Sequence, residues 1–150
     1  MSSRWLVLAL SAALAGCDSN VPCDVESLLD HELGGVADRD CGTLALSDDD
    51  ATFLAARECV VQAFDDAAEF QVIWDVQGID SRVRRAYYGD RIEGVHRLQF
   101  DSGEDGTPSA YARACTVFAM PTEPCEGTLL RDDLCYDCSA SSDRTAFCRR

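Results

Sequence analysis

The clearest hydrophobic pattern in the chain has the period of a helix and begins near Ser47. Apolar residues recur there at three- and four-residue intervals, while charged and amide side chains occupy the other positions. Ser47 as N-cap, with Asp50 three residues later, resembles a capping box. The pattern therefore predicts an amphipathic helix that runs to about residue 67. Its predicted buried face comprises Phe53, Ala56, Val60, Phe64 and Ala67.

After this helix the period of the apolar residues changes to two, which is typical of half-buried strands. Turn residues such as Gly, Asp and Ser cluster at 78–81, 89–90 and 102–108. We therefore predict strands at about 70–76, 82–88, 91–101 and 111–120, followed by a cysteine-rich tail with little regular structure. A shorter helix is predicted from Asp24 to Leu33, because two glycines follow it.

Strands that follow one another through short turns need no crossover connections, which favours an antiparallel sheet over a parallel one. We expect an α+β fold in which one amphipathic helix packs on an antiparallel four-stranded meander, with a disulfide-rich irregular C-terminal tail. In outline this order resembles cystatin-like α+β rolls, although the inhibitory motif of that family is missing. The expected organisation is a signal peptide at 1–16, an acidic segment with a lipid anchor at 17–40, and one disulfide-stabilised domain at 41–150.

The beginning of the chain has the anatomy of a signal peptide. A positively charged start precedes an apolar run at 5–14, which is too short to span a membrane. The next residues, Leu14, Ala15, Gly16 and Cys17, resemble the lipobox of bacterial lipoproteins. That resemblance implies that the leader is cut before Cys17, that Cys17 carries lipid, and that the protein lies in the cell envelope, at the outer membrane or the periplasmic face of the inner membrane. The alternative is an ordinary secretory peptide with a chance cysteine.

The cysteine count supports the lipobox interpretation. The chain has nine cysteines, and assigning Cys17 to lipid leaves an even number, which suits an oxidising compartment. We predict that these remaining cysteines form four disulfides. Proximity in the sequence suggests Cys41 with Cys59, and pairing among the five cysteines from 115 to 148 that leaves one for Cys23. The predicted disulfide cysteines are Cys23, Cys41, Cys59, Cys115, Cys125, Cys135, Cys138 and Cys148.

Two other uses of these thiols remain as alternatives. Cys135 and Cys138 have the CxxC spacing found in thiol redox sites and in zinc sites, although no second close pair accompanies them. The combination of the 78–82 turn, a Phe-Asp-Ser step at 100–102 before a glycine-rich loop, and the terminal cysteine cluster is similar to uncharacterised cysteine-rich lipoproteins. This resemblance covers most of residues 41 to 138 and implies no known activity.

Charge narrows the range of partners. The formal net charge is −14, which argues against nucleic acid because phosphate-backbone binding requires a basic surface. Only the segment 80–97 is locally basic, and forked arginine donors there could hold a carboxylate or phosphate, with Tyr87 or Tyr88 as an aromatic platform. The alternative is that strand alternation separates the arginines and that acidic neighbours pair with them. The candidate anion or partner site is Arg82, Arg84, Arg85, Arg91 and Arg97.

No enzyme motif is present in the sequence. A histidine and a glutamate at 31–32 lack the second histidine of a zinc peptidase, the acidic loop at 101–112 lacks key calcium ligands, and His96 is most simply a residue at the edge of the core. Phosphate-binding and nucleophile motifs are missing as well, so we expect no cofactor and no metal. We expect a non-enzymatic, membrane-anchored binding or structural component. The alternatives are a thiol redox protein and a secreted-type inhibitor domain.

Overall fold

The computed structural model describes residues 22–119, 125–141, 143 and 145–148. The predicted leader and Cys17 lie outside these residues. Within them the chain forms three helices and seven strands. The helices are α1 (Val25–Leu33), α2 (Asp50–Asp65) and α3 (Gly127–Asp133). The strands are β1 (Arg39–Leu44), β2 (Phe70–Val76), β3 (Val83–Asp90), β4 (Gly94–Asp101), β5 (Ser109–Ala119), β6 (Asp137–Ala140) and β7 (Thr145–Cys148).

Aspartates cap the first two helices. The Asp24 side chain accepts a hydrogen bond from the Ser27 backbone N–H at 2.8 Å, and Gly34 ends α1 in the left-handed conformation. Helix α2 starts two residues later than the predicted Ser47 cap implies, because Asp49 and not Ser47 accepts the Thr52 N–H. The carboxylate of Asp48 instead accepts the Ala45 N–H and closes the turn that precedes the helix.

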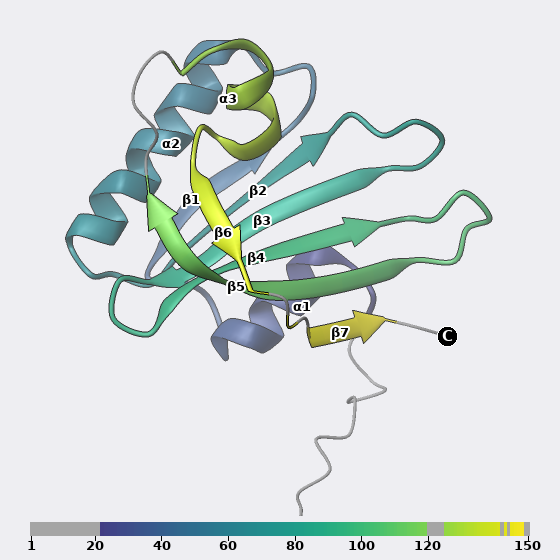
Figure 1. Cartoon of the computed structure of the whole chain (residues 1–150), viewed down its shortest axis with the longest axis horizontal. Coiled ribbons are helices and arrows are strands. Elements are labelled where there is room, and N and C mark those ends of the chain that lie inside the picture. Colours follow the sequence, from purple (N-terminus) through teal and green to yellow (C-terminus); the bar gives the residue numbers. More distant parts are fainter. Residues whose placement is uncertain (1–21, 120–124, 142, 144, 149–150) are drawn as a thin grey trace, which may run out of the picture.

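One sheet organises the fold, with the strand order β1-β2-β3-β4-β5-β6 (Figure 1). Strands β2 to β5 form an antiparallel meander, while β1 pairs with β2 in parallel across the crossover made by α2. The long strand β5 pairs with β7 near its start and with β6 near its end. The sheet is therefore mostly antiparallel, with a parallel pair at one edge.

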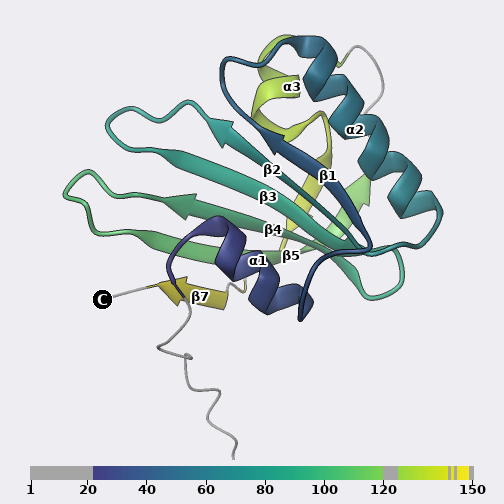
Figure 2. The ribbon, with the colours of Figure 1, turned by 180° about the vertical axis from the view of Figure 1, so that it is seen from behind.

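Helices cover both faces of the sheet, and each face has its own hydrophobic core. Helices α2 and α3 lie on one face and α1 lies on the other, as the view from behind shows (Figure 2). The larger core, under α2 and α3, contains Phe53, Trp74 and Tyr87, and the smaller one contains Leu28 and Leu29 of α1. Alternation along β2 and β3 supplies both cores, since neighbouring side chains point to opposite faces.

The expectation of one helix on a four-stranded meander is wrong. The meander itself is present, but three further strands surround it, and α1 and α3 accompany α2. Of these two helices, α1 matches the shorter helix predicted from Asp24 to Leu33, and α3 was not predicted. Strand β1 is short and contains Gly42, so its apolar residues do not alternate clearly. The tail that we expected to be irregular forms α3, β6 and β7, each held by a disulfide that the local hydrophobic pattern does not reveal.

The third predicted strand also begins later than expected, at Gly94 instead of residue 91. The carboxylate of Asp90 accepts hydrogen bonds from the N–H groups of Ile92 and Glu93, both at 2.6 Å, which fixes this segment as a turn. Gly89 has a φ of 117°, and a Cβ there would collide with the Gly94 carbonyl oxygen. The hairpin therefore requires glycine at position 89.

Candidate functional site: an arginine face and its surroundings

The five candidate arginines do not form one patch, because β3 sends its side chains alternately to the two faces of the sheet. Arg84 is buried on the α1 side, where it forms ion pairs with Glu26 and Asp75. Arg82 is exposed and pairs with Asp75, and Arg91 is exposed in the β3–β4 turn. The structure therefore separates these three arginines from the remaining two.

Arg85 and Arg97 are brought together on the opposite face, beside α3. A terminal nitrogen of each guanidinium approaches the same carboxylate oxygen of Asp133, at 3.1 Å from Arg85 and 3.7 Å from Arg97. The Arg85 nitrogen also donates to the Asp132 carbonyl at 2.8 Å, near the C-terminal end of α3. Arg85 therefore helps to hold α3 on the sheet, while Arg97 makes a single long ion pair.

A third arginine, which the sequence analysis missed, completes this group. Arg113 of β5 is the direct cross-strand partner of Arg97, so both side chains lie on the same face. Its guanidinium lies over the Tyr111 ring, 5.4 Å from the ring centroid. Only the β4–β5 register reveals it, because Arg113 lies outside the basic segment 80–97. We call Arg85, Arg97 and Arg113 the arginine face.

The arginine face has more donors than the described residues satisfy. Asp133 is the one carboxylate that forms an ion pair with it among the described residues. The Nε atoms of Arg85 and Arg113, and the hydroxyl of Tyr87, are buried without a hydrogen-bond partner in the same part of the chain. Burial raises the pKa of Tyr87, which keeps its hydroxyl protonated as a donor. An oxyanion from solvent would reach the partly exposed guanidinium side chains of Arg97 and Arg113, not these buried atoms.

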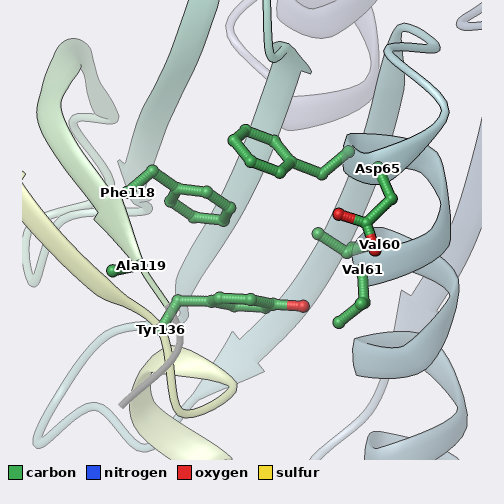
Figure 3. Close-up of a pocket in the computed structure, with 7 residues that line it drawn as sticks. Val60, Val61, Asp65, Phe118, Ala119 and Tyr136 are labelled. Carbon is green, nitrogen blue, oxygen red and sulfur yellow. The ribbon is translucent and has the colours of Figure 1, made fainter.

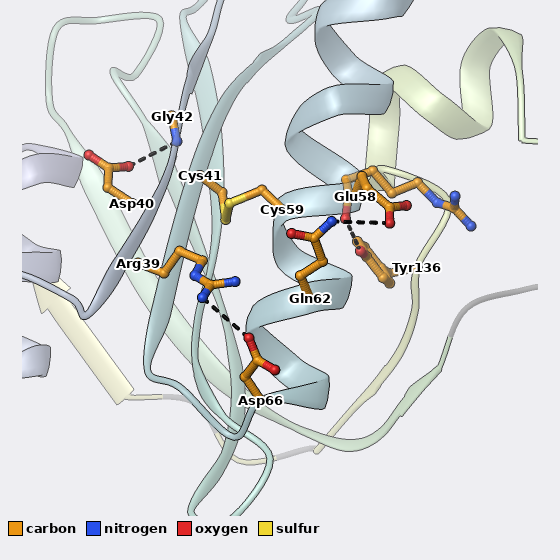
Figure 4. Close-up of a disulfide and its surroundings, with 10 residues drawn as sticks. Arg39, Asp40, Cys41, Gly42, Glu58, Cys59, Gln62, Asp66 and Tyr136 are labelled. Carbon is orange, nitrogen blue, oxygen red and sulfur yellow. Dashed lines mark hydrogen bonds and ion pairs between the residues drawn. A yellow bond between two sulfur atoms is a disulfide. The ribbon is translucent and has the colours of Figure 1, made fainter.

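The cysteines form four disulfides: Cys23–Cys148, Cys41–Cys59, Cys115–Cys138 and Cys125–Cys135. Figure 4 shows the second, which joins β1 to α2. Cys135 and Cys138 thus pair with different partners, whereas a redox CxxC site requires the two to pair with each other. Among the described residues, no group of three or more His, Cys, Asp or Glu side chains could hold a metal ion.

His96 lines a cavity of about 420 Å³ on the α1 face. Its ring stacks on Tyr88 at a centroid distance of 5.2 Å, and the Tyr88 hydroxyl donates to Glu32 at 3.2 Å. Stacking explains why a partly buried histidine is stable in this strand. The cavity is lined by Glu32, Tyr88, His96, Ala112, Ala114, Ser141, Asp143 and Thr145.

The aspartates of the acidic loop at 101–112 stabilise the local backbone. The Asp101 carboxylate accepts the Gly103 N–H and the Asp105 carboxylate accepts the Thr107 N–H, each at 2.9 Å. Both aspartates therefore stabilise turns within the β4–β5 loop. The hydrogen bonds from Thr107 hold the pKa of Asp105 below its usual value, as expected for a solvated turn residue.

A second, apolar cavity of about 200 Å³ lies between α2 and the end of β5 (Figure 3). Aromatic rings dominate its wall: Phe118 stacks on Tyr136 at 4.7 Å and packs against Phe64 at 5.6 Å. One acidic residue, Asp65, belongs to the lining. The complete lining is Val60, Val61, Phe64, Asp65, Phe118, Ala119 and Tyr136.

Comparisons with known proteins give no match: no family model, no curated protein and no solved structure is significantly similar to this chain. None of the helices in the described part of the chain is long and apolar enough to cross a membrane.

Proposed function

We propose that this chain is a lipid-anchored protein of the bacterial cell envelope that binds an oxyanion-bearing partner on the arginine face, without catalysing a reaction. The observation that carries the binding role is the excess of donors at this face. Asp133 forms ion pairs with Arg85 and Arg97, and no carboxylate among the described residues forms one with Arg113, so three guanidinium groups face a single carboxylate. Two of their Nε atoms are also buried without a hydrogen-bond partner in that part of the chain. Forked guanidinium donors match carboxylate and phosphate oxygens.

Two observations support the location in the envelope. The residues Leu14 to Cys17 resemble a lipobox. The four disulfides use all the cysteines of the chain except Cys17. Disulfides of this density are typical of exported domains. Only five residues separate Cys17 from Cys23, which is tied to Cys148, so a span of at most about 18 Å would hold the domain close to the bilayer.

The anchor is tested by expressing the full chain in a bacterial host and measuring its intact mass after purification in detergent. We expect loss of residues 1–16 and a mass increase equal to two or three acyl chains on Cys17. The Cys17→Ser variant should lack this increase and should leave the membrane fraction. An unacylated wild-type chain with the same distribution as the variant would contradict the anchor.

The binding role is tested on the arginine face itself. The double variant Arg97→Gln/Arg113→Gln removes two guanidinium groups and spares Arg85, which holds α3. Crosslinking in intact envelopes, followed by affinity capture, should recover a partner with the wild type and lose at least nine-tenths of it with the double variant. Arg91→Gln removes an exposed arginine of the β3–β4 turn and should leave recovery unchanged.

A defined probe complements the capture experiment. Titration with a short glutamate-rich peptide and with inorganic phosphate separates a carboxylate-bearing partner from a phosphate-bearing one. Binding should weaken as ionic strength rises, because screening reduces the attraction between exposed charges. If the wild type and the double variant bound each probe with the same affinity, the result would contradict the proposed binding role of the arginine face.

A further inference from the structure

The apolar cavity beside α2 combines aromatic rings with a negative charge. The Tyr136 hydroxyl donates to the Arg57 carbonyl at 2.8 Å, which fixes the Tyr136 ring. Phe118 stacks on that ring and also packs edge-on against Tyr87, at a centroid distance of 5.2 Å. The aromatic wall is therefore held in place by contacts outside the cavity, and a ligand would not need to order it.

The acidic residue of the cavity has no counter-charge of its own. Figure 3 shows the Asp65 carboxylate directed toward the rings of Phe118 and Tyr136. Its neighbour Asp66 forms an ion pair with Arg39 at 3.3 Å (Figure 4), whereas the Asp65 carboxylate makes no ion pair or hydrogen bond within the described part of the chain. A carboxylate at an apolar cavity favours a cation over a neutral or anionic ligand.

We propose that this cavity binds a small organic ammonium ion, with a methylated head against the rings of Phe64, Phe118 and Tyr136 and the charge facing Asp65. Ring faces attract cations, and aromatic walls are the usual means of recognising methylated ammonium groups, which have no N–H to donate. The net charge of −14 adds a long-range attraction for cations.

The volume of the cavity limits the size of the ligand. At roughly 30 Å³ for each water-sized group, the cavity of about 200 Å³ holds about six such groups. A trimethylammonium head with a two-carbon substituent matches this space, whereas an acyl chain or a nucleotide base with its sugar exceeds it. The cavity lining contains none of the three arginines of the arginine face, so variants at Asp65 and variants at Arg97 and Arg113 test the two proposals separately.

Choline and its neutral isostere 3,3-dimethyl-1-butanol provide the test, because they have nearly the same shape and differ in charge. Each is titrated into the full chain, purified in detergent, while NMR chemical shifts or heat are recorded. We expect saturable binding of choline and at least ten-fold weaker binding of the alcohol. Asp65→Asn should weaken choline at least ten-fold, and Phe118→Leu should weaken it several-fold.

Asp66→Asn is the matched control, because it removes the same charge one residue away from the cavity. We expect it to change choline affinity less than two-fold, and thermal unfolding of each variant checks that the fold is retained. Equal affinities for choline and the alcohol would assign the cavity to neutral apolar ligands and overturn the proposal. No binding of choline, or an equal loss in Asp65→Asn and Asp66→Asn, would overturn it as well.

Discussion

One terminal nitrogen of Arg84 donates to both carboxylate oxygens of Glu26, at 2.6 and 2.8 Å, and thereby joins α1 to the sheet. The Arg84 side chain is 9% exposed, and its Nε donates to Asp75 at 3.1 Å. Arg84→Met leaves both carboxylates without this partner. We expect it to lower the free energy of unfolding by about 2 kcal/mol, because hydrogen bonds to charged groups contribute more than neutral ones.

Urea denaturation checks this expectation against Arg82→Met. The Arg82 side chain is 62% exposed and also pairs with Asp75, so its loss should cost less than about 1 kcal/mol. Equal losses in the two variants would show that burial does not distinguish these ion pairs.

The same arginine illustrates what the sequence can and cannot predict. The period of the hydrophobic pattern alone predicts that Arg84 and Arg85 of β3 lie on opposite faces of the sheet. The pattern does not predict that Arg84 pairs with Glu26, because 58 residues separate the two in the chain. Elements with a strong period, such as α2 and β2, were predicted within about two residues, since their own side chains specify the buried face.

Elements that depend on distant contacts were missed. Helix α3 spans only Gly127–Asp133, and its packing depends on Trp74 and on the Cys125–Cys135 disulfide. Arg113 joins the arginine face only through the β4–β5 register, and the aromatic cavity requires residues from α2, β5 and the segment before β6. Short apolar segments carry too little local information to predict contacts between residues that are distant in the sequence.

The disulfides Cys23–Cys148 and Cys125–Cys135 close loops of very different length, so their removal should lower the free energy of unfolding by different amounts. Cys23 and Cys148 are 125 residues apart, and Cys125 and Cys135 are 10 apart. Loop-closure entropy in the unfolded chain gives about 5 kcal/mol for the longer loop and about 3 kcal/mol for the shorter one. We expect the Cys23→Ser/Cys148→Ser variant to lose more stability than Cys125→Ser/Cys135→Ser.

Thermal unfolding under non-reducing conditions measures this difference. The Cys125–Cys135 loop lies inside the Cys115–Cys138 loop, which already restricts the same segment and lowers the expected cost further. A larger loss from the shorter loop would show that local packing of α3, and not chain entropy, determines the contribution of these disulfides.

Two buried aromatic donors provide a third comparison. The Trp74 indole N–H donates to the Asp132 carbonyl at 3.0 Å, and the Tyr136 hydroxyl donates to the Arg57 carbonyl at 2.8 Å. Trp74→Phe loses a hydrogen bond and leaves a void in the core, so we expect a loss of about 2 to 3 kcal/mol. Tyr136→Phe loses only the hydroxyl, at about 1 kcal/mol. Denaturant midpoints for the two variants check the order, and the reverse order would contradict it.

Burial raises the pKa of Tyr87, Tyr88 and Tyr136 above the usual value of a phenol. In the unfolded chain each of these phenols releases its proton near pH 10, whereas in the folded chain each keeps it. The unfolded state therefore binds fewer protons above about pH 10, and the free energy of unfolding falls as the pH rises. This stabilisation is fully present below about pH 10 and is lost progressively above it.

The expected slope is large enough to measure. Each retained proton contributes about 1.4 kcal/mol per pH unit, so the three phenols together give a slope of up to about 4 kcal/mol per unit above pH 10. Urea denaturation at several pH values from about 9 to 11, with near-ultraviolet absorbance of the phenolate, measures it. Tyr88→Phe should reduce the slope by about one third, because it removes one of the three protons. A slope that is unchanged in this variant would show that Tyr88 ionises in the folded protein as it does in the unfolded chain.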